Sequence, residues 1–323
     1  MQLAIVGLGA WGRRLVDAAQ DKSDRVRFVS AVARRPDSVK EFADAKGVRV
    51  TSELSEVLAD PAVQGIVSCG PAHLHAEHSM AALKAGKPVL AIKPMALALG
   101  DAVALRAAAE ASGVLLALGY NRCFMPHVAA LRDLLREETL GTILHTEGDF
   151  CANRFFQIKD GDWKADPDHS RAGSLADHPL YLTIETLGPM VDVQAIARSN
   201  VSPNRLADVT AVMARSEAGA TAFLTAIGTT ADFFRFQVFG TKGWAELRGN
   251  STFRLETTDG RKVDTILPAV DAELVQLEAF VDAIEGRAAF PVSPADAVHG
   301  VAVLDAIARS AFDGRTVRVD QTL

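Results

Sequence analysis

The feature that most constrains this chain is a glycine-rich turn near its start. An apolar stretch, residues 3–6, runs into the G-x-G-x-x-G pattern of Gly7, Gly9 and Gly12, and a helix-forming segment follows at once. In that context Gly7 permits the tight turn, Gly9 allows a pyrophosphate to approach the backbone, and Gly12 allows helix and strand to pack closely. The order of strand, glycines and helix therefore predicts a dinucleotide-binding turn.

The residues that follow the glycines are also expected to contact the dinucleotide. We expect Ala10, Trp11 and Arg13 to open the helix, whose free N–H groups face negative charge on the ligand. Arg13 and Arg14 stand in the first helical turn, where the helix dipole disfavours cations. A bound phosphate would resolve that conflict. The alternative is a glycine turn that binds nothing.

Length and composition limit the classes of protein to consider. With 323 residues, 49% hydrophobic and 23% charged, the chain is expected to be a globular protein of two domains. A net charge of −6 without a basic block argues against nucleic acid or an anionic membrane as partner, and no apolar run is long enough to span a bilayer. With no apparent targeting segment before the first strand, we expect a cytoplasmic location.

The spacing of the cysteines and histidines in the sequence does not indicate a metal site. Three cysteines lie far apart, so neither a disulfide framework nor a zinc site is expected. His73, His75 and His78 are close in sequence, but no acidic or cysteine ligand accompanies them, and an exposed helix start is enough to explain them. The sequence therefore predicts no metal.

The order of the expected strands and helices changes along the chain, and this change predicts two domains. Up to residue 120, short apolar strands alternate with helices, which predicts a doubly wound parallel sheet in a domain of residues 1–120. Residues 121–323 instead carry closely spaced strand candidates separated by turns, which predicts an α+β domain with a large, mostly antiparallel sheet. These candidates lie near 207–215, 220–228, 233–239, 243–248 and 251–256.

The end of the second strand bears on the choice of dinucleotide. An NAD-binding unit usually carries an acid there for the ribose 2′-hydroxyl, whereas arginine accommodates a 2′-phosphate. The strand ends here in Arg34 and Arg35, and a guanidinium can bind a phosphate through two charge-assisted hydrogen bonds. We therefore favour NADP. If both arginines are solvated loop charges, NAD is possible as well.

Several short segments, taken in order, resemble one family. The Ile92-Lys93-Pro94 segment is similar to the Glu-Lys-Pro segment of the Gfo/Idh/MocA oxidoreductases, which include glucose-fructose oxidoreductase and inositol dehydrogenase, with Ile92 in place of the glutamate. Residues 71–75 resemble the family's Thr-Pro-Asn-x-x-His turn, from which Gly70 and His73 depart. Residues 119–122 and 240–243 resemble its Gly-Phe-Asn-Arg and Gly-Thr-x-Gly segments. The resemblance implies that Pro71, His75, Lys93 and Asn121 lie on the cofactor side.

The resemblance also points to residues in the second domain. The family combines the lysine with an Asp and a His or Tyr from the helical pattern Gly-Gly-x-x-x-Asp-x-Gly-x-His. In the matching stretch here, residues 171–181, Asp177 falls on the Asp, Pro179 replaces the Gly and Tyr181 falls on the His. A tyrosine at this place is similar to the glucose-fructose oxidoreductase branch.

These residues suit hydride transfer. Lys93 follows a strand at the edge where ligands bind, so that its ammonium can stabilise an alkoxide-like transition state. Asp177 and Tyr181 are four residues apart on one helical face, and a nearby ammonium favours the tyrosinate despite an ordinary pKa near ~10. We assign Tyr181 as acid/base, Lys93 as electrostatic and proton-relay partner, and Asp177 as the orienting group. His178 is the rival acid/base.

The sequence thus predicts an NAD(P)-dependent dehydrogenase or reductase that acts on CH–OH groups of a sugar, cyclitol or related polyhydroxy or carbonyl compound. A catalytically degenerate NADP-binding sensor or regulatory protein is the alternative, because Ile92, Pro179 and Tyr181 depart from the family pattern. The resemblance further implies a homodimer or homotetramer formed through the second-domain sheet. We expect aromatic side chains within residues 233–236 on its exposed face.

Overall fold

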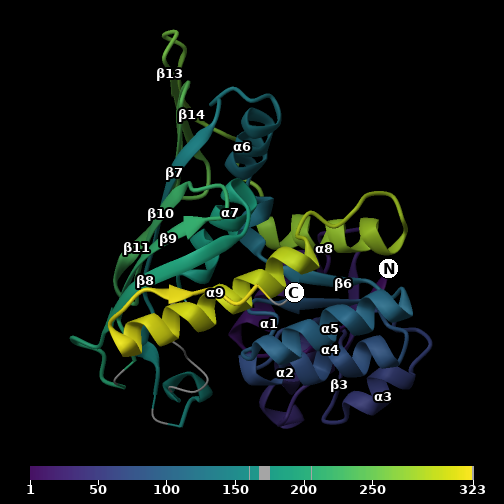
Figure 1. The fold of residues 1–323 in the computed structure, drawn as a ribbon. Coiled ribbons are helices and arrows are strands. Elements are labelled where there is room, and N and C mark those ends of the chain that lie inside the picture. Colours follow the sequence, from purple (N-terminus) through teal and green to yellow (C-terminus); the bar gives the residue numbers. More distant parts are fainter. Residues whose placement is uncertain (160, 167–174, 205, 322–323) are drawn as a thin grey trace. The chain divides into compact units, whose positions relative to one another are not determined.

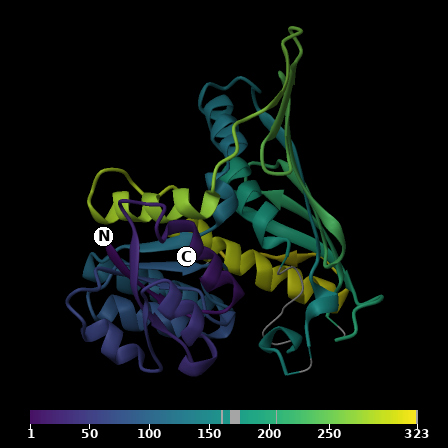
Figure 2. The same ribbon diagram turned by 180° about the vertical axis from the view of Figure 1, so that it is seen from behind.

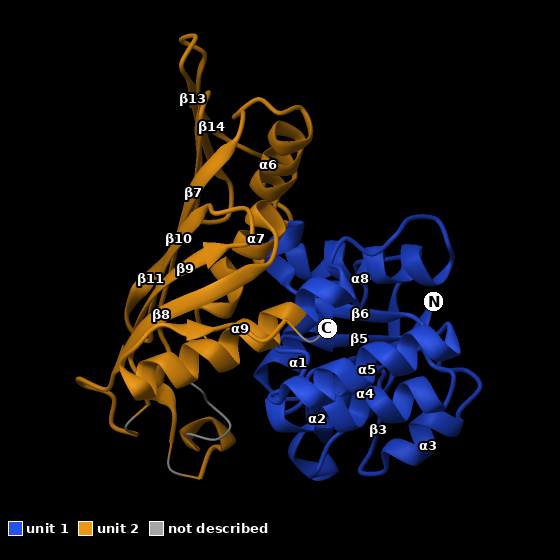
Figure 3. Cartoon of the chain, in the orientation of Figure 1, with its two compact units in different colours: residues 1–124, 271–298 blue, residues 125–270, 299–323 orange. Residues whose placement is uncertain are grey.

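The computed structural model describes residues 1–323 except 160, 167–174, 205 and 322–323 (Figure 1). By packing, the chain divides into two compact units (Figure 3). Unit 1 contains residues 1–124 and 271–298, and unit 2 contains residues 125–270 and 299–323. Unit 1 thus takes in a segment from late in the sequence. The division of the chain at residue 120 into a nucleotide-binding and a substrate domain stays a prediction about function.

The described part of unit 1 contains a six-stranded parallel sheet in the order β3-β2-β1-β4-β5-β6. Its strands are β1 (Gln2–Val6), β2 (Arg27–Val32), β3 (Arg49–Thr51), β4 (Gly65–Ser68), β5 (Val89–Ile92) and β6 (Leu116–Gly119). Strands β4, β5 and β6 are buried along their whole length, as expected for a parallel sheet covered on both faces. The predicted doubly wound fold is confirmed.

Helices cover both faces of this sheet. They are α1 (Ala10–Ala19), α2 (Lys40–Ala45), α3 (Leu54–Ala59), α4 (His75–Lys84), α5 (Leu99–Ser112) and α8 (Ala272–Ile284), with short 3-10 turns η1 (Pro36–Ser38), η2 (Ala72–Leu74) and η3 (Asn121–Phe124). Figure 1 shows α8 on one side of the sheet and α4 and α5 on the other. Leu277, Phe280 and Val281 of α8 are fully buried in the same core as Leu3 and Ile5 of β1. Helix α8 is therefore an integral layer of unit 1.

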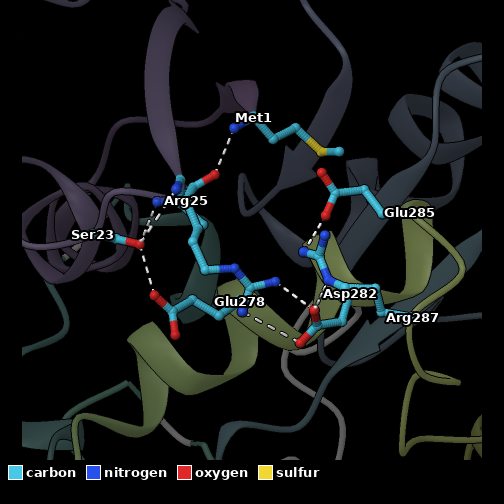
Figure 4. A network of polar contacts seen from close by, with 8 residues as sticks. Met1, Ser23, Arg25, Glu278, Asp282, Glu285 and Arg287 are labelled. Carbon is cyan, nitrogen blue, oxygen red and sulfur yellow. Dashed lines mark hydrogen bonds and ion pairs between the residues drawn. The ribbon is translucent and has the colours of Figure 1, made fainter.

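Polar contacts hold α8 against the connection between α1 and β2 (Figure 4). The Ser23 hydroxyl donates to Glu278 over 2.7 Å, Arg25 forms an ion pair with Asp282, and Arg287 Nε lies 2.6 Å from Asp282. Hydrogen bonds from Arg25 and then Arg287 lower the pKa of Asp282. Asp282 is thus held ionised by two guanidinium groups.

The described part of unit 2 contains a nine-stranded sheet in the order β14-β13-β12-β11-β7-β10-β9-β8-β15. Its strands are β7 (Ile143–Asn153), β8 (Met190–Arg198), β9 (Val209–Ser216), β10 (Thr221–Ile227), β11 (Thr229–Gly240), β12 (Gly243–Arg248), β13 (Thr252–Thr257), β14 (Lys262–Ile266) and β15 (Val317–Arg318). Strands β7 and β10 run parallel, and the other pairs are antiparallel. The sheet is therefore mixed and mostly antiparallel, as predicted.

Helices lie along one face of this sheet. They are α6 (Pro126–Arg136), α7 (Asp177–Leu187) and α9 (Pro294–Asp313), of which residues 299–313 belong to unit 2; short turns η4 (Phe155–Gln157) and η5 (Trp163–Ala165) follow β7. Figures 1 and 2 show these helices on the same side of the large sheet. Phe234 and Phe236 are buried on that side, so the expectation that they are exposed is wrong. The outward positions of this stretch are the half-buried Phe233 and Arg235.

Three further observations concern the predicted absences. The three cysteines, Cys69, Cys123 and Cys151, are free thiols. Among the described residues, no group of three His, Cys, Asp or Glu side chains is arranged to hold a metal ion. None of the helices within that part of the chain is long and apolar enough to cross a membrane.

Candidate active site

The three glycines of the first turn differ in what surrounds them. Gly7 has a φ of +102°, and a Cβ added to it would lie 2.5 Å from the Cα of Gly70. A Cβ on Gly12 would collide with the carbonyl oxygen of Gly7. Around Gly9, by contrast, no described atom lies within 4 Å of an added Cβ. Gly7 and Gly12 are thus required for packing, whereas Gly9 leaves open space over the turn.

The start of α1 has the properties of an anion site. Gly9 is its N-cap and supplies no side-chain cap, and no acid stands in the first turn. The first N–H groups of a helix have no partner within the helix and carry the positive end of its dipole. Ala10 at the helix start is exposed, and Trp11 is half-buried. Open space over Gly9 together with these N–H groups fits a dinucleotide pyrophosphate.

The two arginines of this turn have partners inside unit 1. The Arg13 guanidinium lies 5.1 Å from the centre of the Phe42 ring. Arg14 Nε lies 3.0 Å from Glu273 of α8, and its guanidinium lies over Trp11. Glu273 therefore supplies negative charge beside Arg14, so this arginine does not depend on a phosphate alone.

Glu273 also binds Asn121, which was expected on the cofactor side. The Asn121 amide donates to Glu273 Oε1 over 3.1 Å, and Glu273 is only 3% exposed. Sequence reasoning missed Glu273 because 152 residues separate it from Asn121 and no local pattern marks an acid that packs against a distant loop. A cofactor contact by Asn121 stays a prediction.

Arg34 and Arg35 lie just beyond the end of β2. Both side chains are exposed, and neither guanidinium has a hydrogen bond or ion pair with any residue that the structure describes. Ser38 Oγ donates to the Arg35 carbonyl over 2.7 Å and so fixes the short turn η1 that follows. Two cationic side chains thus stand at the strand end where a ribose 2′-substituent is recognised.

Lys93 and His75 lie at the same edge of the parallel sheet. Lys93 directly follows β5 and is half-buried, whereas Ile92, the last residue of β5, is packed in the core. His75 begins α4, just after Pro71 and η2, and is 3% exposed. Its Nδ1 lies 2.8 Å from the Pro94 carbonyl oxygen and its Nε2 lies 2.9 Å from that of Gly70. Both ring nitrogens of His75 thus face backbone carbonyls.

The residues predicted to act from the second domain lie on α7. Asp177 is its first residue, and Asp177 and Tyr181 are both buried, at 1% and 2% exposure. A carboxylate in the first helical turn is favoured by the helix dipole. His178 is half-buried. Residues 171–174, the start of the matching stretch, lie outside the described residues.

Pro179 stands where the family pattern has a glycine. Strand β7 leaves room for the proline ring. A Cβ added to Gly148 of β7 would lie 2.5 Å from the Pro179 Cβ and 3.0 Å from Leu224. The missing side chain at Gly148 therefore provides the room that the proline ring occupies. Despite the departure at Pro179, Asp177 and Tyr181 stand one turn apart on α7.

Two residues beside α7 were not assigned a site role from the sequence pattern. The Phe150 ring of β7 stacks on the His178 imidazole with 4.7 Å between ring centres and 21° between planes. The guanidinium carbon of Arg154, an exposed residue after β7, lies 5.9 Å from the same Phe150 ring. The Phe150 ring thus contacts both the His178 imidazole and the Arg154 guanidinium. Only the alternation of β7, which places Phe150 on the helix-covered face, could have indicated this.

The predicted site residues thus fall into two groups. Unit 1 holds the glycine turn, Arg34, Arg35, Pro71, His75, Lys93 and Asn121. Unit 2 holds Asp177, His178 and Tyr181. A glycine turn at a helix start, with a lysine at the same sheet edge, defines a nicotinamide-dependent oxidoreductase of the two-domain class.

Comparison with known proteins specifies that class further. Residues 1–120 match the family described as "Oxidoreductase family, NAD-binding Rossmann fold", and residues 128–246 match the GFO/IDH/MocA C-terminal domain. The chain belongs to the GFO/IDH/MocA family and is an NAD(P)-dependent oxidoreductase. The resemblance inferred from the short segments is confirmed.

The individual relatives within this family have low sequence identity to this chain. The chain is 27% identical to 4-carboxy-2-hydroxymuconate-6-semialdehyde dehydrogenase of Sphingobium sp. strain SYK-6, over 89% of this chain and 91% of the relative. It is 26% identical to the NADP-dependent D-xylose 1-dehydrogenase 2 of Haloferax volcanii, over 99% and 100% of the two chains. Other curated relatives match over 51% to 58% of their own length. Among solved structures, GenD2 from gentamicin A biosynthesis, in complex with NAD, superposes with a TM-score of 0.84 at 26% identity and covers 99% of this chain and 96% of its own.

Proposed function

We propose that the chain is an NADP-preferring dehydrogenase or reductase that acts on a CH–OH or carbonyl group of a sugar, cyclitol or related compound. The observation that carries the proposal is the open space over Gly9 at the start of α1, with Lys93 at the same edge of the sheet. The names of the relatives support it, since one of them acts on D-xylose with NADP. A cytoplasmic location stays a prediction.

We assign Tyr181, Lys93 and Asp177 different roles in one hydride transfer. When bound, the nicotinamide accepts or supplies the hydride at its C4 atom. In the oxidation direction, Tyr181 takes the hydroxyl proton while the hydride leaves the carbinol carbon, and the Lys93 ammonium stabilises the alkoxide-like oxygen. Asp177 orients the substrate or the lysine. In the reduction direction, Tyr181 returns the proton to the carbonyl oxygen.

The acid/base assignment is tested with two variants of α7. Tyr181→Phe removes only the hydroxyl, and we expect kcat to fall at least ~10²-fold. His178→Ala is the matched variant, and it is expected to retain more than about a tenth of the wild-type kcat. Near-wild-type turnover of Tyr181→Phe together with a large loss in His178→Ala would transfer the role to His178.

The cofactor preference is assigned to Arg34 and Arg35. Both guanidinium groups are exposed at the end of β2, where they can bind a 2′-phosphate. We expect wild-type kcat/KM to be higher with NADPH than with NADH, and the double variant Arg34→Ser, Arg35→Ser to lose at least ~10-fold of that preference. A clear wild-type preference for NADH would overturn this assignment and would identify NAD as the cofactor.

The substrate panel should include acids as well as neutral polyols. One relative is named for a substrate that carries carboxylate groups, and in this chain the exposed Arg154 contacts the same Phe150 ring on which His178 stacks. We therefore propose to assay aldoses, inositols and carboxylated semialdehydes side by side. Arg154→Ala raises the KM for an anionic substrate and leaves that for a neutral sugar unchanged if the arginine binds the acid group.

The catalytically degenerate sensor remains the second candidate because of the departures at Ile92, Pro179 and Tyr181. Tight NADPH binding without turnover across the whole panel would favour it. Stereospecific reduction of any one carbonyl compound with NADPH would exclude it. Isothermal titration with NADPH and a spectrophotometric assay at 340 nm distinguish the two.

We also propose assembly through the outward face of the large sheet. Large apolar side chains are exposed there on three adjacent strands, Ile196 on β8, Met213 on β9 and Phe223 on β10. Such a patch is typical of a protein–protein interface. The partner is a second copy of this chain, as the family resemblance implies. Light scattering should show a dimer or tetramer, and Phe223→Glu should shift it toward the monomer.

A further inference from the structure

Three loops of unit 1 are connected through one buried imidazole. His75 Nε2 lies 2.9 Å from the Gly70 carbonyl oxygen, in the loop after β4, and Nδ1 lies 2.8 Å from the Pro94 carbonyl oxygen, in the loop after β5. Gly70 in turn touches the loop after β1, because its Cα lies 2.5 Å from where a Cβ of Gly7 would stand. Since β1, β4 and β5 are neighbours in the sheet, the loops are adjacent at its carboxyl edge.

The electrostatic surroundings of His75 show what the ring can do. Burial lowers its pKa, the two carbonyl contacts offset part of that effect, and the charges of Lys93 and His73 lower it further. A neutral imidazole has a single N–H, so His75 donates a hydrogen bond to one of these two carbonyl oxygens and packs against the other. Its nitrogens are occupied by backbone carbonyls on both sides, which leaves it poorly suited to take a proton from a substrate.

We propose that His75 is a positioning residue for Lys93: its imidazole fixes the Lys93–Pro94 turn against Gly70 and thereby against the glycine turn that receives the cofactor. The proposal rests on the function proposed above for Lys93. This role goes beyond the expectation, implied by the family resemblance, that His75 lies on the cofactor side. Pro94 directly follows Lys93, so restraint of its carbonyl restrains the lysine backbone.

The first experiment measures how strongly His75 restrains the two loops, and it requires no catalytic turnover. Hydrogen exchange is measured on the cofactor-free full chain for wild type, His75→Ala and the control His73→Ala, an exposed histidine two residues earlier. We expect the amides of residues 69–70, 91–93 and 95–97 to exchange at least ~10-fold faster in His75→Ala only, with the rest of unit 1 unchanged. Unchanged exchange in both segments would overturn the proposal.

The second experiment separates positioning from cofactor binding. A displacement of about 1 Å at a reacting group can cost ~10²-fold in rate, so we expect kcat of His75→Ala to fall ~10- to 100-fold while the NADPH Kd stays within about threefold. The pH profile of kcat should shift as the Lys93 environment changes. A fall in kcat that is matched by an equal loss of NADPH affinity would instead make His75 a cofactor ligand and overturn the proposal.

A second variant covers the case in which His75→Ala does not fold. His75→Gln keeps one N–H donor in the same place and should retain an intermediate kcat and intermediate exchange rates. Wild-type kcat in His75→Gln together with clearly faster exchange in both segments would show that the restraint does not position Lys93, and it would overturn the proposal. If the wild-type chain turns over no substrate, the proposed function fails, while the hydrogen-exchange result still decides whether His75 holds the loops.

Discussion

The two units present their candidate functional groups in different ways. In unit 1 the side chains of Arg34, Arg35 and Lys93 stand beside backbone groups: the N–H groups at the start of α1, the turn at Gly7 and the loop carbonyls held by His75. In unit 2 they are side chains of one helix, Asp177, His178 and Tyr181 on α7, packed against a mixed sheet.

The difference explains where this chain departs from its family. A site built from backbone requires glycine at fixed places but tolerates change in its side chains, so Ile92 for glutamate leaves the strand end in place. A site built from side chains can change its chemistry by single exchanges, provided that the helix keeps its position. Pro179 and Gly148 illustrate this condition, because the extra ring on α7 occupies the space of a side chain missing from β7.

The largest effect is expected for Gly7→Ala. The new Cβ would meet the Gly70 backbone at 2.5 Å, in a residue with φ of +102°, so either the turn or the neighbouring loop must move. We expect a loss of about 3 kcal/mol in the free energy of unfolding and no measurable NADPH binding. Urea denaturation and fluorescence titration with NADPH measure the two effects.

Gly9→Ala is the matched control for this prediction. Its Cβ would enter open space, so stability should change by less than about 0.5 kcal/mol while NADPH affinity still falls. Wild-type NADPH affinity in Gly9→Ala would contradict the placement of the pyrophosphate over this turn.

The second prediction makes the same kind of change in unit 2. In Gly148→Ala the new Cβ would press on Pro179 and shift α7, so we expect kcat to fall about 10-fold. The NADPH Kd should stay within about twofold of wild type. Adding Pro179→Gly should restore kcat by removing the collision. A double variant as slow as Gly148→Ala alone would show that the two residues do not share this space.

The two units also differ in how far their structure could be predicted from the sequence. The glycine turn, the parallel sheet and Lys93 at a strand end could be predicted because each depends on residues close together in the chain. The position of α8 could not, since Phe280 and Glu273 contact residues more than 100 positions away. In unit 2, alternation predicted most strands but missed β8 and β14, and nothing local could reveal that β7 and β10 run parallel.

The faces of β11 show a further limit. Alternating aromatic residues indicate a strand, but they do not say which face is covered. Phe234 and Phe236 are buried on the face that the helices cover, and His127 of α6 stacks on Phe234 with 6.4 Å between ring centres. For α7 the sequence could place Asp177 and Tyr181 on one helix, whereas the compensation of Pro179 by Gly148 needed the pairing of two distant segments.

The third prediction concerns an acid that holds a loop in unit 2. Asp208 accepts hydrogen bonds from the backbone N–H groups of Asn200, Val201 and Ser202 over 2.7 to 2.9 Å. Burial alone would raise the pKa of Asp208, but these hydrogen bonds and one from the Asn200 side chain lower it. We expect Asp208→Asn to lose about 1–3 kcal/mol in the free energy of unfolding at pH 7.

The sign of the pH dependence follows from that lowered pKa. The folded state holds its proton more weakly than the unfolded chain, so the stabilisation is present above about pH 4 and is lost as the pH falls through the folded pKa. Denaturation curves at pH 7, 5 and 3 should therefore show the gap between wild type and Asp208→Asn narrowing toward pH 3. A gap that stays constant with pH would assign the effect to packing.

The smallest effect is expected for Asp282→Asn in unit 1. Asp282 also has a lowered pKa, caused by hydrogen bonds from Arg25 and then Arg287, so its stabilisation likewise disappears at acid pH. These groups are partly exposed to solvent, and exposed ion pairs contribute little and are screened by salt. We expect a small drop in Tm at low ionic strength that vanishes in 1 M NaCl, whereas the Asp208→Asn deficit persists because its partners are backbone groups around a buried acid. A salt-resistant drop for Asp282→Asn would show that the network in Figure 4 holds α8 by more than charge.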